Sequence, residues 1–352
     1  MPEHKGNQHR NLCFPVKGLP KIGAQWTKIY SCSDTIENYL VDENVLYLCD
    51  NNHFIAINIL NQKILWKTQI PEVWFKIPFS MNETSIVQGC YDGTVICLNK
   101  HTGTIRWKRK FEGYEARYSL IAIDSFALCV MHKMGKHPQL VCLHLNSGET
   151  FWLYHSPPPR EFGNNYSHLM HDNGIVVYSA GSALYGLSLI KGSTVFVHDS
   201  KGYMRCHPVI DGNQVIYLKD KTLYFYSLNI FAPDGSYAFD TSFGYKGKWD
   251  EGIVVASDLV FCGSVPGGLH IYDKKTQRAL EPKYFPSLIS VADNHFYCMQ
   301  IELFRYRLPD FHKDSYGVPK DCEGRSILSG IPPLLTNQGI FVYINGSIYR
   351  VS

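Results

Sequence analysis

The sequence predicts an all-β protein: an eight-bladed β-propeller of four-stranded antiparallel blades, in which the N-terminal strand closes the ring. Two observations carry this prediction. A large aromatic or apolar residue returns about every 40 to 45 residues along most of the chain, and a short apolar run that ends in Asp or Asn returns eight times. No stretch has the spacing of a long amphipathic helix, so strands are the regular elements that we expect.

The first repeated position is a large side chain near the end of each unit. It is held in turn by Trp26, Trp66, Trp107, Trp152, Phe196, Phe239 and Leu280. A periodic aromatic residue is usually buried, because its large surface contributes most when it packs. We therefore expect these side chains to pack between neighbouring blades.

The second repeated position is a turn between two apolar strands. In chain order it holds Asp42, Asn82, Asp124, Asp172, Asp211, Asp258, Asp293 and Asn337. Asp and Asn suit such turns because their side chains bond the backbone two residues further on. Eight copies of the turn predict eight blades.

The stretch YDGTVICLNKHTGTIRWKRK, from Tyr91 to Lys110, contains the hairpin and the outer strand of one unit. Asp92-Gly93 is a strong hairpin signal, and Thr102-Gly103 marks the turn before the last strand. Apolar residues alternate on both sides of that second turn, as half-buried strands require. With the apolar runs before it, the unit has four short strands.

The two ends of the sequence complement each other. The last unit, GIFVYINGSIYRVS, ends after its third strand, whereas AQWTKIY (24–30) is a fourth strand without a unit. Pairing them completes the eighth blade and removes the exposed edges of an open sheet array. We expect a single propeller domain over residues 22–352, preceded by a flexible extension over residues 1–21.

The repeat in Tyr91–Trp107, a hairpin Asp-Gly, an apolar strand, Asn-x-x-Thr-Gly and then Trp, resembles that of pyrroloquinoline-quinone-type propellers, the quinoprotein alcohol dehydrogenase-like fold. The resemblance covers about residues 22–352 and implies one of two branches. The dehydrogenases of this superfamily hold their cofactor against a disulfide between adjacent cysteines, with a calcium ion nearby. The sequence has no Cys-Cys pair, so the resemblance favours the non-catalytic branch, similar to the outer-membrane barrel-assembly lipoprotein, which binds proteins. The Gly-His and Trp-Asp pairs of WD repeats are absent from the repeat positions.

Composition and missing motifs narrow the function further. A net charge of +3 over 352 residues predicts no nucleic-acid partner. The N-terminus has no apolar region of a signal peptide or lipoprotein, and no run of 18 apolar residues exists, so we expect a cytoplasmic protein without membrane contact. Most of the eleven cysteines fall in strand-like runs and none forms CxxC, which favours reduced, buried thiols. GxSxG, HExxH and phosphate-binding loops are absent, and we expect neither cofactor nor metal.

Two long connections between blades hold aromatic residues outside the repeat. The first, from His155 to Asp172, contains Arg160, Phe162 and Tyr166, and the second (240–252) contains Tyr245 and Trp249. Exposed Trp, Tyr and Arg side chains are the common anchors of protein interfaces. We therefore predict a monomeric, non-enzymatic scaffold that binds a protein or peptide through these loops of one face.

The alternative prediction is an enzyme of lyase or hydrolase type. Alignment on the Asp/Asn turn puts His168 and His207 at equivalent inner-strand positions of adjacent blades, where both line the central channel together with Arg117. Such a group would form a small-molecule site at the channel mouth. A metal site would need a third ligand, which the alignment does not supply.

Overall fold

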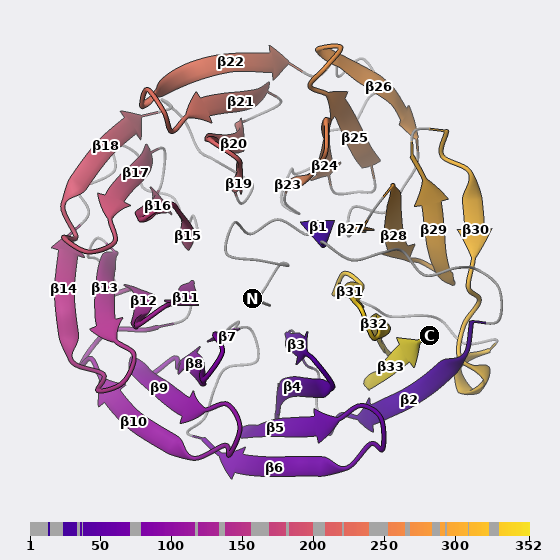
Figure 1. Cartoon of the computed structure of the whole chain (residues 1–352), viewed down its shortest axis with the longest axis horizontal. Helices are drawn as coiled ribbons and strands as arrows, with labels where there is room; N and C mark the ends of the chain where they lie inside the picture. The colour runs from indigo at the N-terminus through magenta and orange to yellow at the C-terminus, as the bar shows by residue number, and fades with distance from the viewer. Residues whose placement is uncertain are drawn as a thin grey trace.

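The computed structural model describes residues 13–14, 24–33, 36, 38–70, 79–116, 119–133, 138–155, 169–180, 183–199, 208–219, 222–238, 253–264, 268–283, 289–292, 294–308, 310–323 and 331–352. These residues form eight antiparallel sheets around a central axis, which confirms the predicted eight-bladed propeller (Figure 1). The inner strands surround the axis, and the outer strands run around the circumference.

The blades are numbered in chain order, each from its inner to its outer strand. Blade 1 contains β3 (Tyr39–Asp42), β4 (Val45–Asp50), β5 (His53–Asn58) and β6 (Ile64–Gln69); blade 2 contains β7 (Ser80–Met81), β8 (Ser85–Gly89), β9 (Thr94–Asn99) and β10 (Ile105–Lys110). Blade 3 contains β11 (Leu120–Ile123), β12 (Phe126–Met131), β13 (Gln139–His144) and β14 (Thr150–His155); blade 4 contains β15 (Leu169–Asp172), β16 (Ile175–Ala180), β17 (Ala183–Ser188) and β18 (Thr194–Asp199).

The second half of the ring follows the same order. Blade 5 contains β19 (Val209–Asp211), β20 (Gln214–Lys219), β21 (Thr222–Ser227) and β22 (Ala232–Ala238); blade 6 contains β23 (Ile253–Ala256), β24 (Leu259–Ser264), β25 (Gly268–Asp273) and β26 (Arg278–Lys283). Blade 7 contains β27 (Ile289–Ala292), β28 (His295–Met299), β29 (Leu303–Arg307) and β30 (Lys313–Ser315), and blade 8 contains β31 (Leu334–Thr336), β32 (Gly339–Ile344), β33 (Ser347–Val351) and β2 (Trp26–Ser31). A short 3-10 helix, η1 (Lys320–Cys322), lies between blades 7 and 8.

The N-terminal strand closes the ring as predicted. β2 pairs antiparallel with β33, from Trp26 opposite Val351 to Ser31 opposite Ser347. The backbone of Gln25 extends this ladder by bonding that of Ser352 in both directions. Blade 8 is therefore built from the two ends of the propeller domain.

The strand pattern follows from how blades stack. The three inner strands of a blade are covered on both faces by neighbouring blades, so runs such as TVICLN in β9 are almost entirely buried. The outer strands alternate between exposed and half-buried side chains, as in β10 and β14. Differences between apolar and charged surface therefore arise mostly from the exposed side chains of the outer strands.

Three tryptophans join consecutive blades in the same way. The indole N–H of Trp66 donates to the carbonyl of Lys100 at 3.1 Å, that of Trp107 to Leu145 at 2.8 Å, and that of Trp152 to Leu189 at 2.7 Å. Each ring lies against a turn glycine of the next blade: Gly103, Gly148 and Gly192. A Cβ at these glycines would come within 2.5, 2.7 and 2.6 Å of the indole atoms. The predicted packing between blades is confirmed for these three residues.

The turn before each outer strand has a local cause. The Asn99 Oδ1 accepts hydrogen bonds from the backbone N–H groups of His101 and Thr102 at 2.9 and 3.1 Å. This holds the chain in a turn that ends at Gly103, whose φ of 70° favours glycine. The Asn-x-x-Thr-Gly pattern thus sets both the turn and the surface on which Trp66 docks.

The repeat changes in the later blades. Phe196 is buried and its ring stacks on Phe231 of blade 5 at 5.5 Å, so an aromatic contact replaces the indole bond. In blade 5 the equivalent register position is Gly235, which pairs with Phe225. Gly235 thus holds the register position that we expected for Phe239, and Phe239 itself lies outside the described residues.

One strand lies inside the ring. β1 (Cys13–Phe14) pairs parallel with β27, Cys13 opposite Val291 and Phe14 opposite Ala292, and makes blade 7 a five-stranded sheet. Figure 1 shows β1 on the channel side of β27. These two residues are the described part of the extension over residues 1–21.

Candidate protein-binding surface

All eight residues that the sequence indicated for a site lie outside the described part of the chain. These are the predicted partner contacts Arg160, Phe162, Tyr166, Tyr245 and Trp249, and the predicted channel residues Arg117, His168 and His207. The first loop connects β14 to β15 and the second connects β22 to β23. Both connections join the outer strand of one blade to the inner strand of the next, and their location on one face of the propeller stays a prediction.

The described surface carries an apolar area that the sequence reasoning missed. The outer apolar wall consists of Phe151 and Leu153 on β14, Val195 and Val197 on β18, and Ile190, Ile230 and Phe231 on the turns before β18 and β22. Each of these side chains is 37–68% exposed. They are seven of the twelve large apolar side chains that are exposed among the described residues, and they fall in three consecutive blades. Such a concentration marks an interaction site more often than scattered apolar residues do.

Contacts between blades make the wall continuous. β14, β18 and β22 follow one another around the circumference (Figure 1). The hydroxyl of Thr194, at the start of β18, donates to the Tyr154 hydroxyl of β14 at 3.4 Å. The Phe196–Phe231 stack then joins β18 to the turn before β22. These contacts hold the three blades next to one another, so their exposed apolar side chains lie on adjacent blades.

Aromatic packing beneath the wall holds its side chains in place. The ring of Phe151 stacks on Phe126 at 4.8 Å with an interplanar angle of 26°, and lies 4.8 Å from the ring of His144. At the other end of the wall, Phe196 also packs on Tyr226 at 5.0 Å. A pre-ordered apolar surface loses less entropy when a partner binds.

The imidazole of His198, on β18 behind the wall, is kept neutral. The His198 Nε2 lies 2.7 Å from the Tyr217 hydroxyl, in the junction between blades 4 and 5. Burial, with a smaller contribution from Lys219, lowers the pKa of His198 below its ordinary value, against the opposing charge of Asp199. The His198 imidazole is therefore uncharged at neutral pH.

The backbone of the wall is also available for contact. β14 and β18 are the last strands of their sheets, and no described strand pairs with their outer edges. Soluble proteins usually protect such edges with charges or proline. β10 presents Arg106, Lys108 and Lys110 there, and β22 contains Pro233 and Asp234, whereas the exposed centres of β14 and β18 are apolar. These two outer strands lack the usual protection.

A basic strand borders the wall. Arg106, Lys108 and Lys110 alternate along β10 in blade 2, next to β14 of blade 3. Arg106 donates to the Ser85 hydroxyl at 2.8 Å, and the Lys110 Nζ lies 3.6 Å from an Asp92 carboxylate oxygen. Lys108 has no ion pair with a described residue. A partner that covers β14 and reaches β10 would meet apolar groups first and positive charge beside them.

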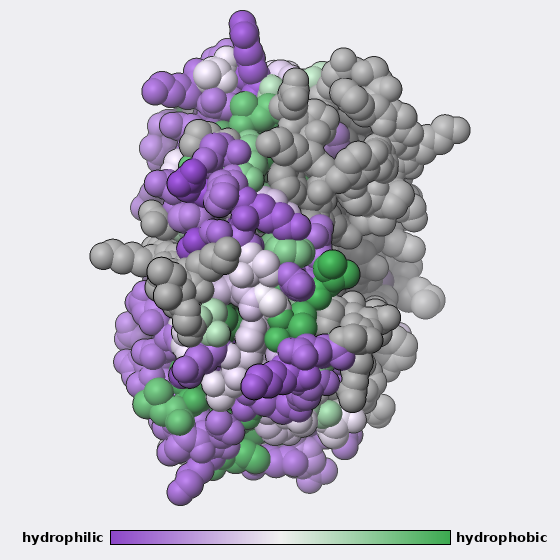
Figure 2. Space-filling model, turned by 90° about the vertical axis from the view of Figure 1, so that its right-hand side faces the viewer, coloured by the Kyte–Doolittle hydropathy of each residue, from purple (hydrophilic) through white to green (hydrophobic). Residues whose placement is uncertain are grey.

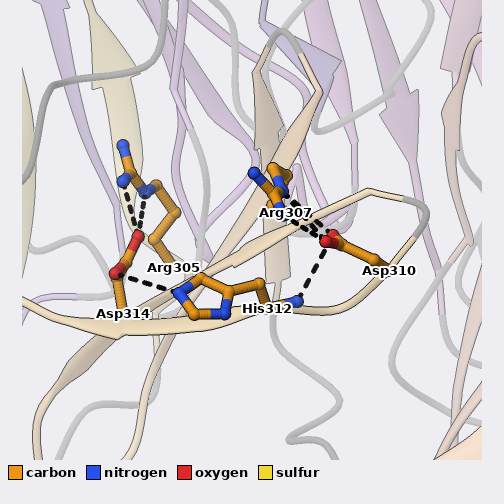
Figure 3. Close-up of polar contacts among 5 residues, drawn as sticks. All are labelled: Arg305, Arg307, Asp310, His312 and Asp314. Carbon is orange, nitrogen blue, oxygen red and sulfur yellow. Dashed lines mark hydrogen bonds and ion pairs between the residues drawn. The ribbon is translucent and has the colours of Figure 1, made fainter.

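The opposite side of the molecule has a different character. On the side shown in Figure 2, hydrophilic side chains dominate the described surface and apolar ones form small separate groups. In blade 7 the charges neutralise each other: Arg305 pairs with Asp314 at 2.6 Å, Arg307 pairs with Asp310, and His312 lies 3.8 Å from Asp314 (Figure 3). Arg307 holds the pKa of the Asp310 carboxyl at about 2. Self-paired charges leave less to attract a partner.

The described residues do not fit the metal and quinone site of the dehydrogenases that the repeat resembles. The sequence has no adjacent cysteines to supply the disulfide, and among the described residues no three His, Cys, Asp or Glu side chains gather as a metal site would need. Burial also raises the pKa of Cys49, Cys90 and Cys298 to about 12, which makes these three thiols poor nucleophiles. No catalytic step through a quinone is derived from these residues.

Among the described residues, no helix has both the length and the hydropathy to cross a membrane. No curated protein matches the sequence significantly. A family model described as outer membrane protein assembly factor BamB matches residues 26–280.

Solved structures share the fold over nearly the whole chain. BamB from Moraxella catarrhalis has a TM-score of 0.71 at 11% identity, covering 93% of this chain and 99% of that one. A europium-containing methanol dehydrogenase has a TM-score of 0.75 at 11% identity, covering 97% and 89%. The quinohemoprotein alcohol dehydrogenase ADHIIG from Pseudomonas putida has a TM-score of 0.70 at 10% identity, covering 97% and 74%. The predicted resemblance to pyrroloquinoline-quinone-type propellers is confirmed, and at these identities the structures show the fold alone.

Proposed function

This chain belongs to the family described as outer membrane protein assembly factor BamB, and from that premise we propose that it is a non-enzymatic propeller scaffold that binds a protein or peptide partner. The family description names an assembly factor, which acts on other proteins. The observation that carries the proposal is the outer apolar wall on blades 3–5, beside the basic strand β10.

The surface defines the chemistry of the partner. Its binding segment has apolar side chains that cover Phe151, Leu153 and Val197, and acidic side chains that reach β10. The apolar contacts supply affinity, and the charges on β10 raise the association rate and fix the orientation.

The two loops that the sequence indicated extend the same interface in this proposal. The segment with Arg160, Phe162 and Tyr166 follows β14 directly, and the segment with Tyr245 and Trp249 follows β22. Both therefore begin at blades that carry the wall. These five residues stay predicted contacts, and we place them at the rim of the partner's footprint.

The test uses the intact chain as bait, identifies cross-linked partners by mass spectrometry, and then measures affinity for each purified partner. Leu153→Glu together with Val197→Glu should weaken binding about tenfold or more, because interface anchors dominate binding energy. The matched control is Leu65→Glu on β6, an outer-strand side chain that is 52% exposed and lies outside the wall. Tyr166→Ala with Trp249→Ala tests the loops separately.

Two outcomes would overturn the proposal. In the first, the wall variant and the loop variant both bind every partner as the wild type does. In the second, the chain shows turnover of a small molecule that His168→Ala abolishes, which would establish the alternative of an enzyme with a site at the channel mouth.

The predicted cellular location, oligomeric state and excluded partners are also part of the proposal. We propose a cytoplasmic monomer that contacts neither nucleic acid nor membrane. Cell fractionation and gel filtration of the native protein test this, and recovery in an envelope fraction or as a stable dimer would contradict it.

A further inference from the structure

The inner strand of each blade presents an edge to the central channel. In seven of the eight sheets this strand is the last of its sheet among the described residues. β27 alone has a neighbour there, the parallel strand β1. β1 also lies near β23 of blade 6, so it occupies the channel beside two blades.

The local sequence explains why the extension is extended at this point and why its strand is short. Pro15 follows Phe14, and the residue before a proline is restricted to extended conformations. Proline also has no N–H, so residue 15 cannot donate a backbone hydrogen bond to continue the ladder. The pair Cys13–Phe14 thus carries a built-in preference for a short strand.

The edge strand β27 is buried and fixed to its neighbour, whereas β1 is held by the pairing of only two residues. Every residue of β27 is buried, and the Ser290 hydroxyl bonds the carbonyl of Pro333 in blade 8, which fixes β27 to its neighbour. β1 contributes two residues in parallel register, the weaker of the two pairing modes. A pre-formed edge with a short resident strand is the arrangement by which sheets bind extended peptides.

We propose that the channel edge of β27 is a binding site for an extended peptide that has an apolar residue before a proline, and that Cys13–Phe14 occupies this site in cis. The site is separate from the outer apolar wall. A partner's extended segment pairs with β27 in parallel register once β1 has left, so Cys13–Phe14 competes with the partner for this edge.

The experiment compares full-length chains that differ in the resident strand. Cys13→Pro with Phe14→Pro removes both backbone N–H donors of β1 and should free the edge. His4→Pro with Lys5→Pro places the same change elsewhere in the extension and serves as control. The probe is a fluorescent peptide of residues 10–20, RNLCFPVKGLP, measured by anisotropy under reducing conditions.

The C13P/F14P chain should bind the probe saturably at one site. The wild type and the control should bind it at least about tenfold more weakly, because a tethered strand acts at an effective concentration of order a millimolar. A probe with Phe14→Pro should not bind. Amide hydrogen exchange of residues 290–293 should accelerate in C13P/F14P and slow again when the probe is added. Equal binding to all three chains, no binding to C13P/F14P, or no change in exchange overturns the proposal.

Discussion

The junctions between blades 1 to 4 and the junction that closes the ring hold neighbouring blades together with different chemical groups. Between blades 1 and 2, 2 and 3, and 3 and 4, an indole ring lies against a glycine and donates one hydrogen bond. At the closing junction a buried carboxylate joins the two blades. Asp50 of blade 1 accepts hydrogen bonds from the Tyr30 hydroxyl and from the backbone N–H and hydroxyl of Ser33, at 2.9–3.1 Å.

Trp26 shows the difference most directly. It pairs with Val351, the last residue of β33. Trp26 therefore holds the register position that Ile64 holds in blade 1, and not the position of Trp66. Its indole donates to the carbonyl of Tyr316 at 2.8 Å, toward blade 7. Packing of an indole ring against glycine can therefore stabilise the repeated junctions, whereas polar and charged groups stabilise the closing junction.

The largest expected effect comes from removing the closing strand. Deletion of residues 1–30 takes away most of β2, exposes the edge of β33 and removes Trp26, and loss of a large core aromatic alone costs about 3–5 kcal/mol. Deletion of residues 1–18 removes β1 but leaves β2 intact, and should cost only about 1–3 kcal/mol, because β1 adds one short stretch of backbone pairing. Chemical denaturation measures both. Equal stability of the two truncations would contradict the closure scheme.

The next effect separates the tryptophan contact from backbone strain. Gly148 and Gly174 have φ angles of 74° and 77°, but a Cβ at Gly148 would lie 2.7 Å from Trp107, whereas nothing lies within 4 Å of one at Gly174. Both alanine variants incur strain of about 1–2 kcal/mol. Gly148→Ala should lose a further 1–3 kcal/mol, roughly the range for overpacking a core. Equal losses in urea unfolding would show that the indole contact contributes nothing.

The closing junction should respond to loss of its buried charge. Asp50→Asn keeps the shape but weakens charge-assisted bonds, and should cost about 1.5–3 kcal/mol. Tyr30→Phe removes one donor and should cost about 1 kcal/mol. Because the two groups are in contact, the double variant should lose less than the sum. Additive losses would show that the Tyr30–Asp50 bond contributes nothing at closure.

The smallest effect is a pH dependence that the tryptophan junctions lack. The Lys28 ammonium and the Tyr349 hydroxyl bond Asp321, and Lys28 holds the pKa of this carboxyl below its ordinary 3.8. A depressed folded pKa contributes stability above the unfolded value, which is lost as pH falls through the folded one. Wild type should therefore be slightly more stable than Asp321→Asn at pH 7, and the difference should shrink below about pH 3.8. A constant difference between pH 7 and pH 2 would contradict this.

The sequence was sufficient for the fold because each blade repeats its own local signals. Asn99 and Gly103 specify the turn on which Trp66 docks, and Trp107, which follows in the same unit, docks on the corresponding turn of the next blade. The unpaired fourth strand at 24–30 indicates closure. Spacing alone could not predict that Trp26 faces blade 7, because a shift of register by one or two residues leaves the period almost unchanged.

The candidate surface was harder to predict because binding residues need not repeat. The wall was missed although a signal existed: TFWLYH and TVFVHD carry apolar residues where IRWKRK carries basic ones. The repeat does not explain the aromatic loop residues Tyr166 and Trp249, and their role in partner binding stays a prediction. Strand β1 was not foreseen, because two residues before a proline give no periodic pattern.

The closing pair also sets the order in which the molecule is made. Ser31 and Ser347 meet across 316 positions of sequence, whereas the four antiparallel strands of every other blade follow one another in the chain. A chain emerging from the ribosome therefore completes seven local meanders while β2 waits without a partner, and contacts of such high sequence separation form slowly. We expect the open ring to be the long-lived folding intermediate and the state most exposed to aggregation through its free edges.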